Sequence, residues 1–402
     1  MRIASGASGV AIGLYLASLA NRGFHVSTAL VGAIGAVAFA AELISVVPMG
    51  VASDAIAPRG LMSAGALLGA VGTQLLGMSS LTGLFFVGRA VEGLGAAATT
   101  PALLSHFTDV TEGSHSLRAR VMTYFELSLL AGLAVGGLAG AELWRSLNAS
   151  AFTVIALFYV VSAAMLFFSA VESRGYGSAA ALMAFRSALE NPSLRTLAPV
   201  WLCVNAIVGL WLGPTLSFLL TRNFHDHQLL AGVFASHPDK VGWLLFGYAL
   251  VFGAGLTMWS VILPRTAKTW VMRLALVAMI CVCLGLYLLN HLSADLSTAR
   301  TTVGIATALC IMVESGFTPA ALTMLAEAMG ARSGRGAAMG IYSVLLGLGA
   351  IGGSLLAAVL GQAFAIDGLI YGTFVMAIIG LLLVGRLTTS VSRPQKAVSS
   401  RK

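Results

Sequence analysis

Two oppositely charged residues, Arg89 and Glu92, lie inside an apolar run that extends from Leu81 to Leu104. Residues three positions apart lie on the same face of a helix, so the guanidinium and the carboxylate can meet. A charged group in the hydrocarbon core of a membrane costs about 2.5–3.5 kcal/mol on insertion scales, and it usually faces a partner or an aqueous path. The pair can therefore form a fixed ion pair, or its carboxylate can take up and release a proton as its surroundings change.

Three further acidic residues, Glu42, Glu126 and Glu314, lie within apolar runs. A buried carboxylate without a partner is more stable protonated than charged. Four such acids against Arg89, the single arginine in the middle of a run, leave an excess of protonatable sites. This balance favours proton coupling over a purely structural network. The expected carriers, in order, are Glu92, Glu126, Glu42 and Glu314.

Aromatic and amide side chains gather in and near the apolar run from 197 to 221. Such groups suit a cavity for flat, lipophilic or cationic molecules, through apolar contact and cation–π attraction. The alternative is that they pack between helices or anchor the chain at the membrane interface, which is the commoner role. The candidates for the cavity wall are Trp201, Asn205, Trp211 and Tyr124. The absence of a second mid-run arginine or lysine disfavours anionic substrates.

Other kinds of chemistry have little support. His225 and His227 could suggest a zinc site, but two histidines so close on flexible backbone lack a defined tetrahedral set, so we expect a solvated loop and no metal. The sequence contains no glycine-rich phosphate loop, nucleophile elbow or nucleotide-binding motif. We therefore expect no catalytic residues, no cofactor and no direct use of ATP, and we do not expect an enzyme.

The composition points to a membrane protein. Hydrophobic residues make up 58% of the chain and charged residues 9%, whereas soluble domains average about a quarter charged residues. Twelve apolar stretches have the roughly 20 residues that a helix needs to cross a bilayer. They lie near 3–20, 27–49, 61–79, 81–104, 121–143, 151–171, 197–221, 241–263, 270–290, 301–326, 337–363 and 368–387. The expected fold is an all-α integral membrane protein with twelve transmembrane helices.

The distribution of lysine and arginine predicts the orientation, because these residues concentrate in cytoplasmic segments. With a cytoplasmic N-terminus, the loops on the other side keep only Arg22, Arg145, Arg222, Lys240 and Arg300. We therefore expect both termini in the cytoplasm and the chain in the cytoplasmic (inner) membrane, with its first stretch a span and not a cleaved signal. The net charge of +8 then reflects topology, and no nucleic-acid partner is expected.

The two halves of the chain resemble each other. Three patterns recur in the same order: Pro58-Arg59 and Pro264-Arg265, Val91-Glu92-Gly93 and Val313-Glu314-Ser315, Gly136-Gly137 and Gly352-Gly353. This repetition predicts two pseudo-symmetric six-helix halves, 1–171 and 197–387, a cytoplasmic linker at 172–196 and a basic cytoplasmic tail at 388–402. Duplicated bundles of this kind place a substrate site at the midplane between the halves.

Three motifs resemble those of the major facilitator superfamily, and the resemblance covers essentially the whole chain. The loop after the second stretch has Gly50, Asp54 and Arg59, although Ala55 and Ala57 replace an expected basic residue and glycine. The fourth stretch, Arg89-Ala-Val-Glu92-Gly93-Leu-Gly95, is similar to a motif of proton-coupled members. The fifth resembles the glycine-rich motif of the twelve-span drug/proton antiporter branch, with Gly137 in place of its proline and Ala141 in place of its last glycine.

This resemblance implies a secondary transporter that works by alternating access between its halves. It implies a gate at Gly50, Asp54 and Arg59, although Asp54 could simply cap a turn. It also implies close helix packing at Gly132, Gly136, Gly137 and Gly140. The expected partners are a small-molecule substrate, protons and the lipid bilayer, with the chain acting as a monomer.

The resemblance favours one direction of transport. We expect proton-coupled export of a lipophilic or amphipathic molecule. The alternatives are proton-driven uptake or facilitated passage of a small polar metabolite, and a lipid or glycolipid flippase.

Overall fold

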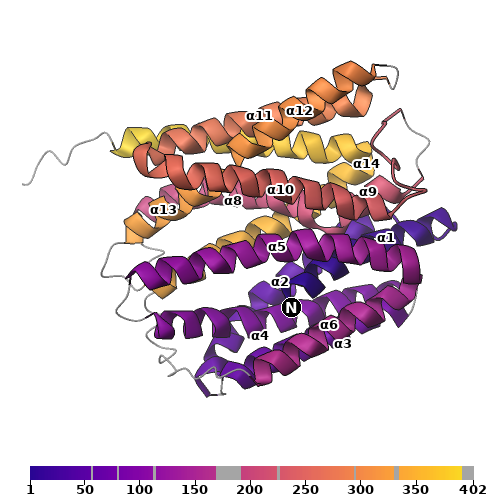
Figure 1. The fold of residues 1–402 in the computed structure, drawn as a ribbon, viewed down its shortest axis with the longest axis horizontal. Coiled ribbons are helices and arrows are strands. Elements are labelled where there is room, and N and C mark those ends of the chain that lie inside the picture. Colours follow the sequence, from indigo (N-terminus) through magenta and orange to yellow (C-terminus); the bar gives the residue numbers. More distant parts are fainter. Residues whose placement is uncertain are drawn as a thin grey trace, which may run out of the picture.

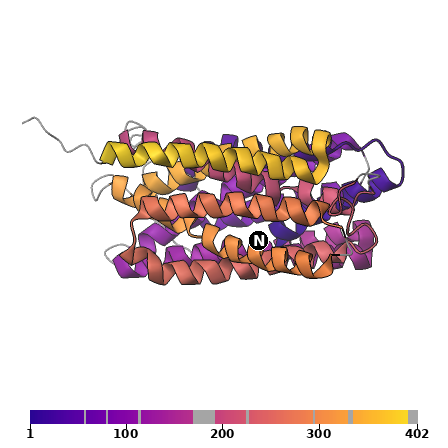
Figure 2. The ribbon, with the colours of Figure 1, turned by 90° about the horizontal axis from the view of Figure 1, so that it is seen from above.

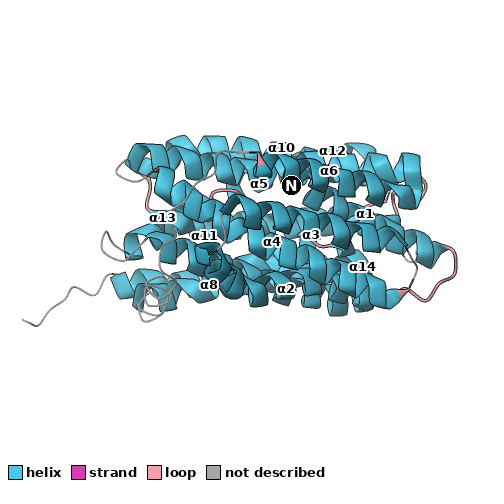
Figure 3. Ribbon diagram, turned by 90° about the horizontal axis from the view of Figure 1, so that it is seen from below, coloured by secondary structure: helices cyan, strands magenta, loops and turns pink. Residues whose placement is uncertain are grey.

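The computed structural model describes residues 1–55, 58–78, 81–111, 115–168, 192–223, 227–293, 296–329 and 335–391. Every regular element in these ranges is helical (Figure 3). Nine ranges among the described residues are long and apolar enough to cross a membrane, and three of them, Leu127–Phe167, Ser297–Leu325 and Val344–Leu387, each contain parts of two α-helices or of two helical arms. The chain is therefore an all-α membrane protein, as its composition predicts.

The first half consists of α1 (Arg2–Asn21), α2 (Thr28–Ala55), α3 (Pro58–Met78), α4 (Thr82–Val110), α5 (His115–Leu147), the short 3-10 helix η1 (Asn148–Ser150) and α6 (Ala151–Phe167). The second half consists of α8 (Pro192–Leu212), α9 (Pro214–Thr221), α10 (Asp239–Ile262), the 3-10 helix η2 (Leu263–Arg265), α11 (Lys268–His291), α12 (Ser297–Glu314), α13 (Phe317–Met329) and α14 (Arg335–Val391). Each of the twelve predicted stretches falls on one or more of these helices.

Three breaks were not evident from hydropathy. The seventh predicted stretch is divided into α8 and α9 because Gly213 is extended and Pro214 starts a new helix. The tenth is interrupted at Ser315 and Gly316, which separate α12 from α13. The eleventh and twelfth form α14, which reverses at Ala365, where φ is 48°. Helices also run past the predicted ends, because backbone hydrogen bonding continues beyond the apolar stretch.

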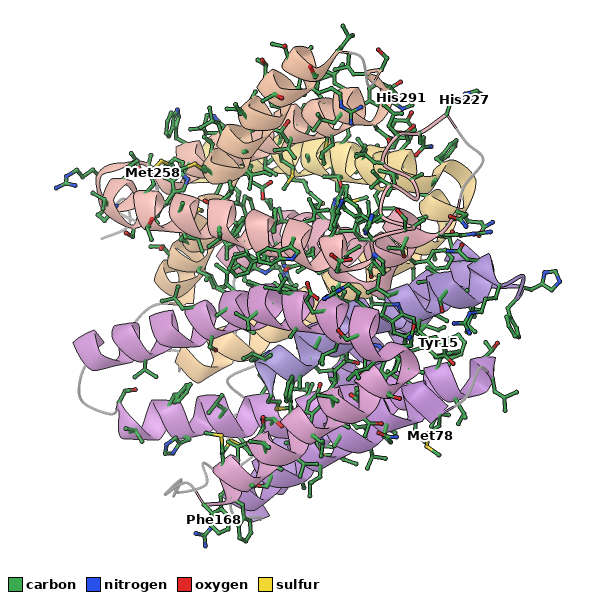
Figure 4. All side chains as sticks on the ribbon, turned by 45° about the vertical axis from the view of Figure 1, so that its right-hand side comes forward. Tyr15, Met78, Phe168, His227, Met258 and His291 are labelled. Atoms are coloured by element: carbon green, nitrogen blue, oxygen red, sulfur yellow. The ribbon has the colours of Figure 1, made fainter. Side chains whose placement is uncertain are left out.

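The helices run along the long axis of the molecule and pack in layers (Figures 1 and 2). We call one end the Asn21 end, where α1, α9 and α11 finish and α14 reverses, and the other the Val391 end, where α14 finishes. In Figure 1 they lie to the right and the left, and the start of α1 lies between them. In Figure 4, His227 and His291 mark the Asn21 end, whereas Phe168 and Met258 lie toward the opposite end.

Glycines let helices touch at corresponding places in the two halves. In the first half, side chains at Gly136 and Gly140 of α5 would overlap the carbonyl oxygens of Ile3 and Ala7 in α1. In the second half, a side chain at Gly353 of α14 would overlap the backbone of α8. Small residues are the usual means of close helix association in lipid, where no hydrophobic force drives helices together. Gly132 also faces α1, whereas Gly137 faces Leu245 of α10, in the other half.

A buried polar cluster fastens the second half at the Asn21 end. The Asn290 Nδ2 donates to Asp367 Oδ1 at 2.8 Å, and the Leu230 backbone N–H donates to Asn290 Oδ1 at 2.8 Å. His291 Nε2 lies 2.9 Å from Asp367 Oδ2. Gln228 also binds this cluster, since its Oε1 accepts from Asn290 Nδ2 at 3.2 Å. The segment between α9 and α10 is thereby fixed to the end of α11 and to the part of α14 just after its reversal at Ala365.

Two predicted boundaries differ from the observed helices. The predicted linker lies largely outside the described residues, but its last part belongs to α8, which already begins at Pro192. The predicted tail starts at residue 388, whereas α14 continues to Val391.

Candidate functional site

A cavity of about 350 Å³ lies between the two halves. Its wall comes mainly from α1, α2, α4, α5 and α6, and residues of α8, α9 and α10 complete it. Among the side chains that the structure describes, four charged ones line it: Arg2, Glu42, Arg89 and Glu92. The volume lies within the range of about 300–1,000 Å³ that is typical of small-molecule sites.

Glu92 is held by donors from three helices. On α4, Arg89 Nη1 lies 2.5 Å from Glu92 Oε2, with side-chain exposures of 11% and 5%. Ser8 Oγ of α1 donates to Glu92 Oε1 at 2.6 Å, and Thr73 Oγ1 of α3 donates to the same oxygen at 2.5 Å. Helix α3 can come this close because a side chain at Gly72 would meet Glu92. Both oxygens of the carboxylate therefore accept hydrogen bonds.

Glu42 lines the same cavity in a different environment. It has no hydrogen-bond partner among the residues that the structure describes. The positive charge of Arg2, which lines the same cavity, attracts its carboxylate. Phe39 lies one turn earlier on α2 and also faces the cavity. Unlike Glu92, the Glu42 carboxylate is open to whatever the cavity holds.

Arg2 corrects the prediction of a single mid-run arginine. It was assigned to a cytoplasmic segment, but the start of α1 lies alongside α5 within the bundle, and Arg2 lines the cavity. Hydropathy identifies an apolar stretch without giving its depth relative to its neighbours. The charge-based argument against anionic substrates therefore loses its basis.

The other predicted acids lie elsewhere. Glu314 is buried at the end of α12 in the second half, close enough to Tyr248 and Cys283 to act on them electrostatically, and it does not line this cavity. Glu126 belongs to α5, but its side chain lies outside the described residues. The structure thus brings Glu42 and Glu92 together and leaves Glu314 apart.

Only Trp211 among the described aromatic and amide candidates lines the cavity. Its Nε1 donates to Thr373 Oγ1 at 2.7 Å, which fixes the ring. Trp201 and Asn205 do not line the cavity: Asn205 Nδ2 donates to the Trp201 carbonyl oxygen at 2.9 Å, and the Trp201 ring packs against Phe317. They face the interior of the second half because they lie on another side of α8. The side chain of the fourth candidate, Tyr124, is outside the described residues.

Sequence reasoning missed several polar groups of the wall. They are Ser5, Thr99, Thr100, Ser128, Tyr159 and Ser217. Serine and threonine are common in transmembrane helices, and nothing in their local pattern distinguishes a hydroxyl that faces a cavity from one that binds its own backbone.

The halves touch each other at the Asn21 end. Asn21 Nδ2 donates to the Thr221 carbonyl oxygen at 3.1 Å, and the Asn223 backbone N–H donates to Asn21 Oδ1 at 2.8 Å. A side chain at Gly35 of α2 would lie 2.9 Å from the Pro214 ring, so α9 packs closely against the first half. These contacts close the cavity toward this end.

The sequence profile of the Major Facilitator Superfamily matches residues 1–236 and 211–402 of this chain. The chain belongs to the Major Facilitator Superfamily. It is therefore a secondary transporter of a small molecule across a lipid bilayer, and not an enzyme. No curated protein sequence gives a significant match. The family predicted from the motifs is confirmed, whereas the match does not single out the drug/proton antiporter branch.

Solved structures of this superfamily have the same fold. A bacterial homologue of the human lysosomal transporter Spinster, inward-facing and occupied, has a TM-score of 0.71 at 15% identity, with 96% of this chain and 94% of that chain covered. Its inward-facing and unoccupied form has a TM-score of 0.70 at 14% identity, with 98% and 96% covered. The nucleoside transporter NupG has a TM-score of 0.68 at 12% identity, with 98% and 100% covered. At these identities the likeness shows the fold alone.

The superfamily loop motif is only partly described. Asp54 lies in the last turn of α2, which extends to Ala55, and not in an open turn as predicted. Arg59 lies in the first turn of α3 and is exposed. The surroundings of Gly50 and of the Asp54 side chain are not described, so the predicted gate stays a prediction.

Replacing Asn21 with alanine is expected to open the cavity toward the Asn21 end of this superfamily transporter. The change removes two hydrogen bonds between the halves, each worth about 0.5–1.5 kcal/mol, which corresponds to a roughly tenfold shift toward the open form. The measurement is the labelling rate of a cysteine introduced at Ser217, in a background without the native cysteines, by a membrane-impermeant maleimide. Ser18→Ala is the control, because Ser18 donates to the Tyr15 carbonyl within its own helix. Equal labelling in both variants would contradict this role of Asn21.

Proposed function

We propose that the chain is a proton-coupled transporter that exports a lipophilic or amphipathic small molecule by alternating access. The observation that best supports this proposal is that Glu42 and the Arg89–Glu92 pair line one cavity between the two halves. Titratable groups in a membrane interior are costly and usually serve an ion or proton pathway. A carboxylate in the wall of a cavity that opens to alternate sides can load a proton on one side and release it on the other.

The cavity wall suits an amphipathic substrate. Phe39, Leu133 and Trp211 offer apolar contact area, and the hydroxyl of Thr100 offers a hydrogen bond. Binding sites for small molecules combine a mainly apolar wall with a few polar groups that fix orientation. A substrate with an apolar body and one or two polar groups matches this wall.

Export and orientation rest on the sequence motifs and on the charge pattern. The glycine-rich pattern of α5 resembles that of drug/proton antiporters, and three of its four glycines face α1. With the C-terminus in the cytoplasm of a cell with an inner membrane, the Val391 end faces inward and the Asn21 end faces outward. The state described here is then closed toward the outside and is the one that takes up substrate from the cytoplasm. We expect a monomer to be sufficient, because each half contributes to one cavity within a single chain.

Accumulation in cells tests the direction. Cells that produce the protein are compared with cells that lack it, with fluorescent lipophilic cations, neutral dyes and weak acids supplied outside. Export predicts lower retention of at least one compound, and a protonophore should raise retention to the level of the control cells. Higher retention in the producing cells would indicate uptake. No difference for any compound would argue against a lipophilic substrate.

Proton-driven uptake of a small polar metabolite is the second candidate. It is favoured by Arg2, which places a second arginine on the cavity wall together with several hydroxyls. Arginine recognises carboxylate and phosphate groups well, so an acidic metabolite becomes a reasonable substrate. The same accumulation experiment with radiolabelled organic acids distinguishes the two directions by its sign.

A further inference from the structure

We propose that Glu42, and not Glu92, is the acid of the cavity that exchanges protons, and that Glu92 belongs to a fixed hydrogen-bond network of the scaffold. This assignment deepens the proposed function and reverses the order that the sequence suggested. It rests on the hydrogen bonds of the two carboxylates and on the helices that supply them.

Both oxygens of the Glu92 carboxylate are held by hydrogen-bond donors. Its Oε1 accepts from the Ser8 and Thr73 hydroxyls, and its Oε2 accepts from the Arg89 guanidinium. Ser8 and Thr73 are themselves completely buried. Hydrogen bonds to a charged group contribute about 1.5–3 kcal/mol each, so protonation of either oxygen is opposed by the donors that surround it.

The partners of Glu92 move with it. Ser8, Thr73 and Arg89 lie on α1, α3 and α4, all in the first half. Alternating access is largely a rocking of one half against the other about the central site. A rigid rotation of the first half would leave these donor–acceptor distances unchanged. The hydrogen bonds of Glu92 are therefore the same whichever side of the membrane the cavity faces.

Glu42 lies where the two halves meet. It is on α2, which packs against α14 of the second half; a side chain at Gly32 would meet Ala358, and the neighbouring Leu43 faces Gly347. When the halves rock, α2 exchanges its contacts with α14. The surroundings of Glu42 therefore change between states, which is the property that a proton carrier needs.

The charged groups near Glu42 permit both protonation states. From α1, Arg2 attracts its carboxylate; Met1 also lines the cavity, and its amino group donates to Ser162 Oγ. From α4 comes the Arg89–Glu92 pair, whose charges offset each other, and from α6 the Tyr159 hydroxyl. The described side chains of α9 and of α14 up to Ala365 contribute no charged group. The apolar surroundings of Glu42 favour its protonated form, and the attraction of Arg2 favours its charged form.

Carbodiimide labelling tests this assignment without a known substrate. Dicyclohexylcarbodiimide is an apolar reagent that adds to protonated carboxyl groups. The purified full chain in detergent is treated with it between pH 5 and 9, and modified peptides are identified by mass spectrometry. We expect Glu42 to be labelled at low pH, with loss of labelling as the pH rises, and Glu92 to stay unlabelled throughout. Labelling of Glu92, or no labelling of Glu42 at any pH, would overturn the proposal.

Two variants control for accessibility. In Ser8→Ala/Thr73→Val, Glu92 loses both hydroxyl donors and should become labelled, which shows that the reagent reaches that depth. In Glu42→Gln, labelling at this position should be lost while the protein still elutes as a folded species.

The outcomes separate this assignment from the proposed function. A pH-dependent label on Glu42 in a protein that moves no protons would retain the assignment and overturn the proposed coupling. A label on Glu92 in a protein whose transport is coupled to protons would overturn the assignment and retain the proposed coupling.

Discussion

Replacing Arg89 with methionine is expected to lower the stability of the folded protein strongly. The change leaves the Glu92 carboxylate, whose side chain is 5% exposed, without its cation. Breaking a buried ion pair by deleting one partner costs about 3–5 kcal/mol, which is a large part of the 5–15 kcal/mol that stabilises a typical protein. The measurements are the yield of monodisperse protein in size-exclusion chromatography and its thermal unfolding in detergent.

The chain contains a matched control for this prediction. Arg145 and Glu142 of α5 have the same spacing, with Arg145 Nε 2.9 Å from Glu142 Oε2, but their side chains are 56% and 36% exposed. An exposed pair contributes about 0–1 kcal/mol, so Arg145→Met should have little effect. The double variant Arg89→Met/Glu92→Gln should recover much of the loss, because it removes both charges. Equal stability of Arg89→Met and Arg145→Met would show that the buried pair is not needed.

Alanine at Gly353 is expected to destabilise the protein strongly, whereas alanine at the adjacent Gly352 is not. A side chain at Gly353 would overlap the Ala206 carbonyl oxygen and lie 2.9 Å from the Gly209 Cα, both in α8. At Gly352 there is nothing within 4 Å. Overpacking costs about 1–3 kcal/mol, while glycine to alanine in an open helix position gains about 0.4–1 kcal/mol.

Thermal unfolding of the two variants gives the comparison directly. Both carry the same chemical change on the same helix, so differences in helix propensity cancel. Gly353→Ala should unfold at lower temperature than wild type and Gly352→Ala at the same or higher temperature. The opposite order would place the contact face of α14 elsewhere and would overturn the packing of α8 against it.

The sequence alone was sufficient for interactions within one helix. The spacing of Arg89 and Glu92 predicts their contact because positions three apart share a face, and the structure has that ion pair. The Ser8 and Thr73 donors could not be predicted in this way. They lie on α1 and α3, so only the packing of three helices brings their hydroxyls to the same oxygen.

The sequence also could not predict how deep a residue lies in the bundle or which way its side chain points from the helix axis. Arg2 was assigned to a cytoplasmic segment because hydropathy marks where a run begins, not where it lies beside α5. Trp201, Asn205 and Trp211 lie on one stretch of sequence, yet only Trp211 reaches the cavity, since Trp201 and Asn205 share another face of α8. The apolar content of the run is nearly continuous, so periodicity gives no preferred face.

Proton movement in proteoliposomes tests the central claim most directly. Purified protein is reconstituted with a pH-sensitive dye trapped inside, and lipophilic cations, organic acids, sugars and amino acids are added outside in turn. Proton-coupled transport predicts a change of internal pH that depends on one class of compound, is absent from empty vesicles and is lost in Glu42→Gln. Passage of a compound at the wild-type rate without any pH change would contradict coupling and would identify a facilitator.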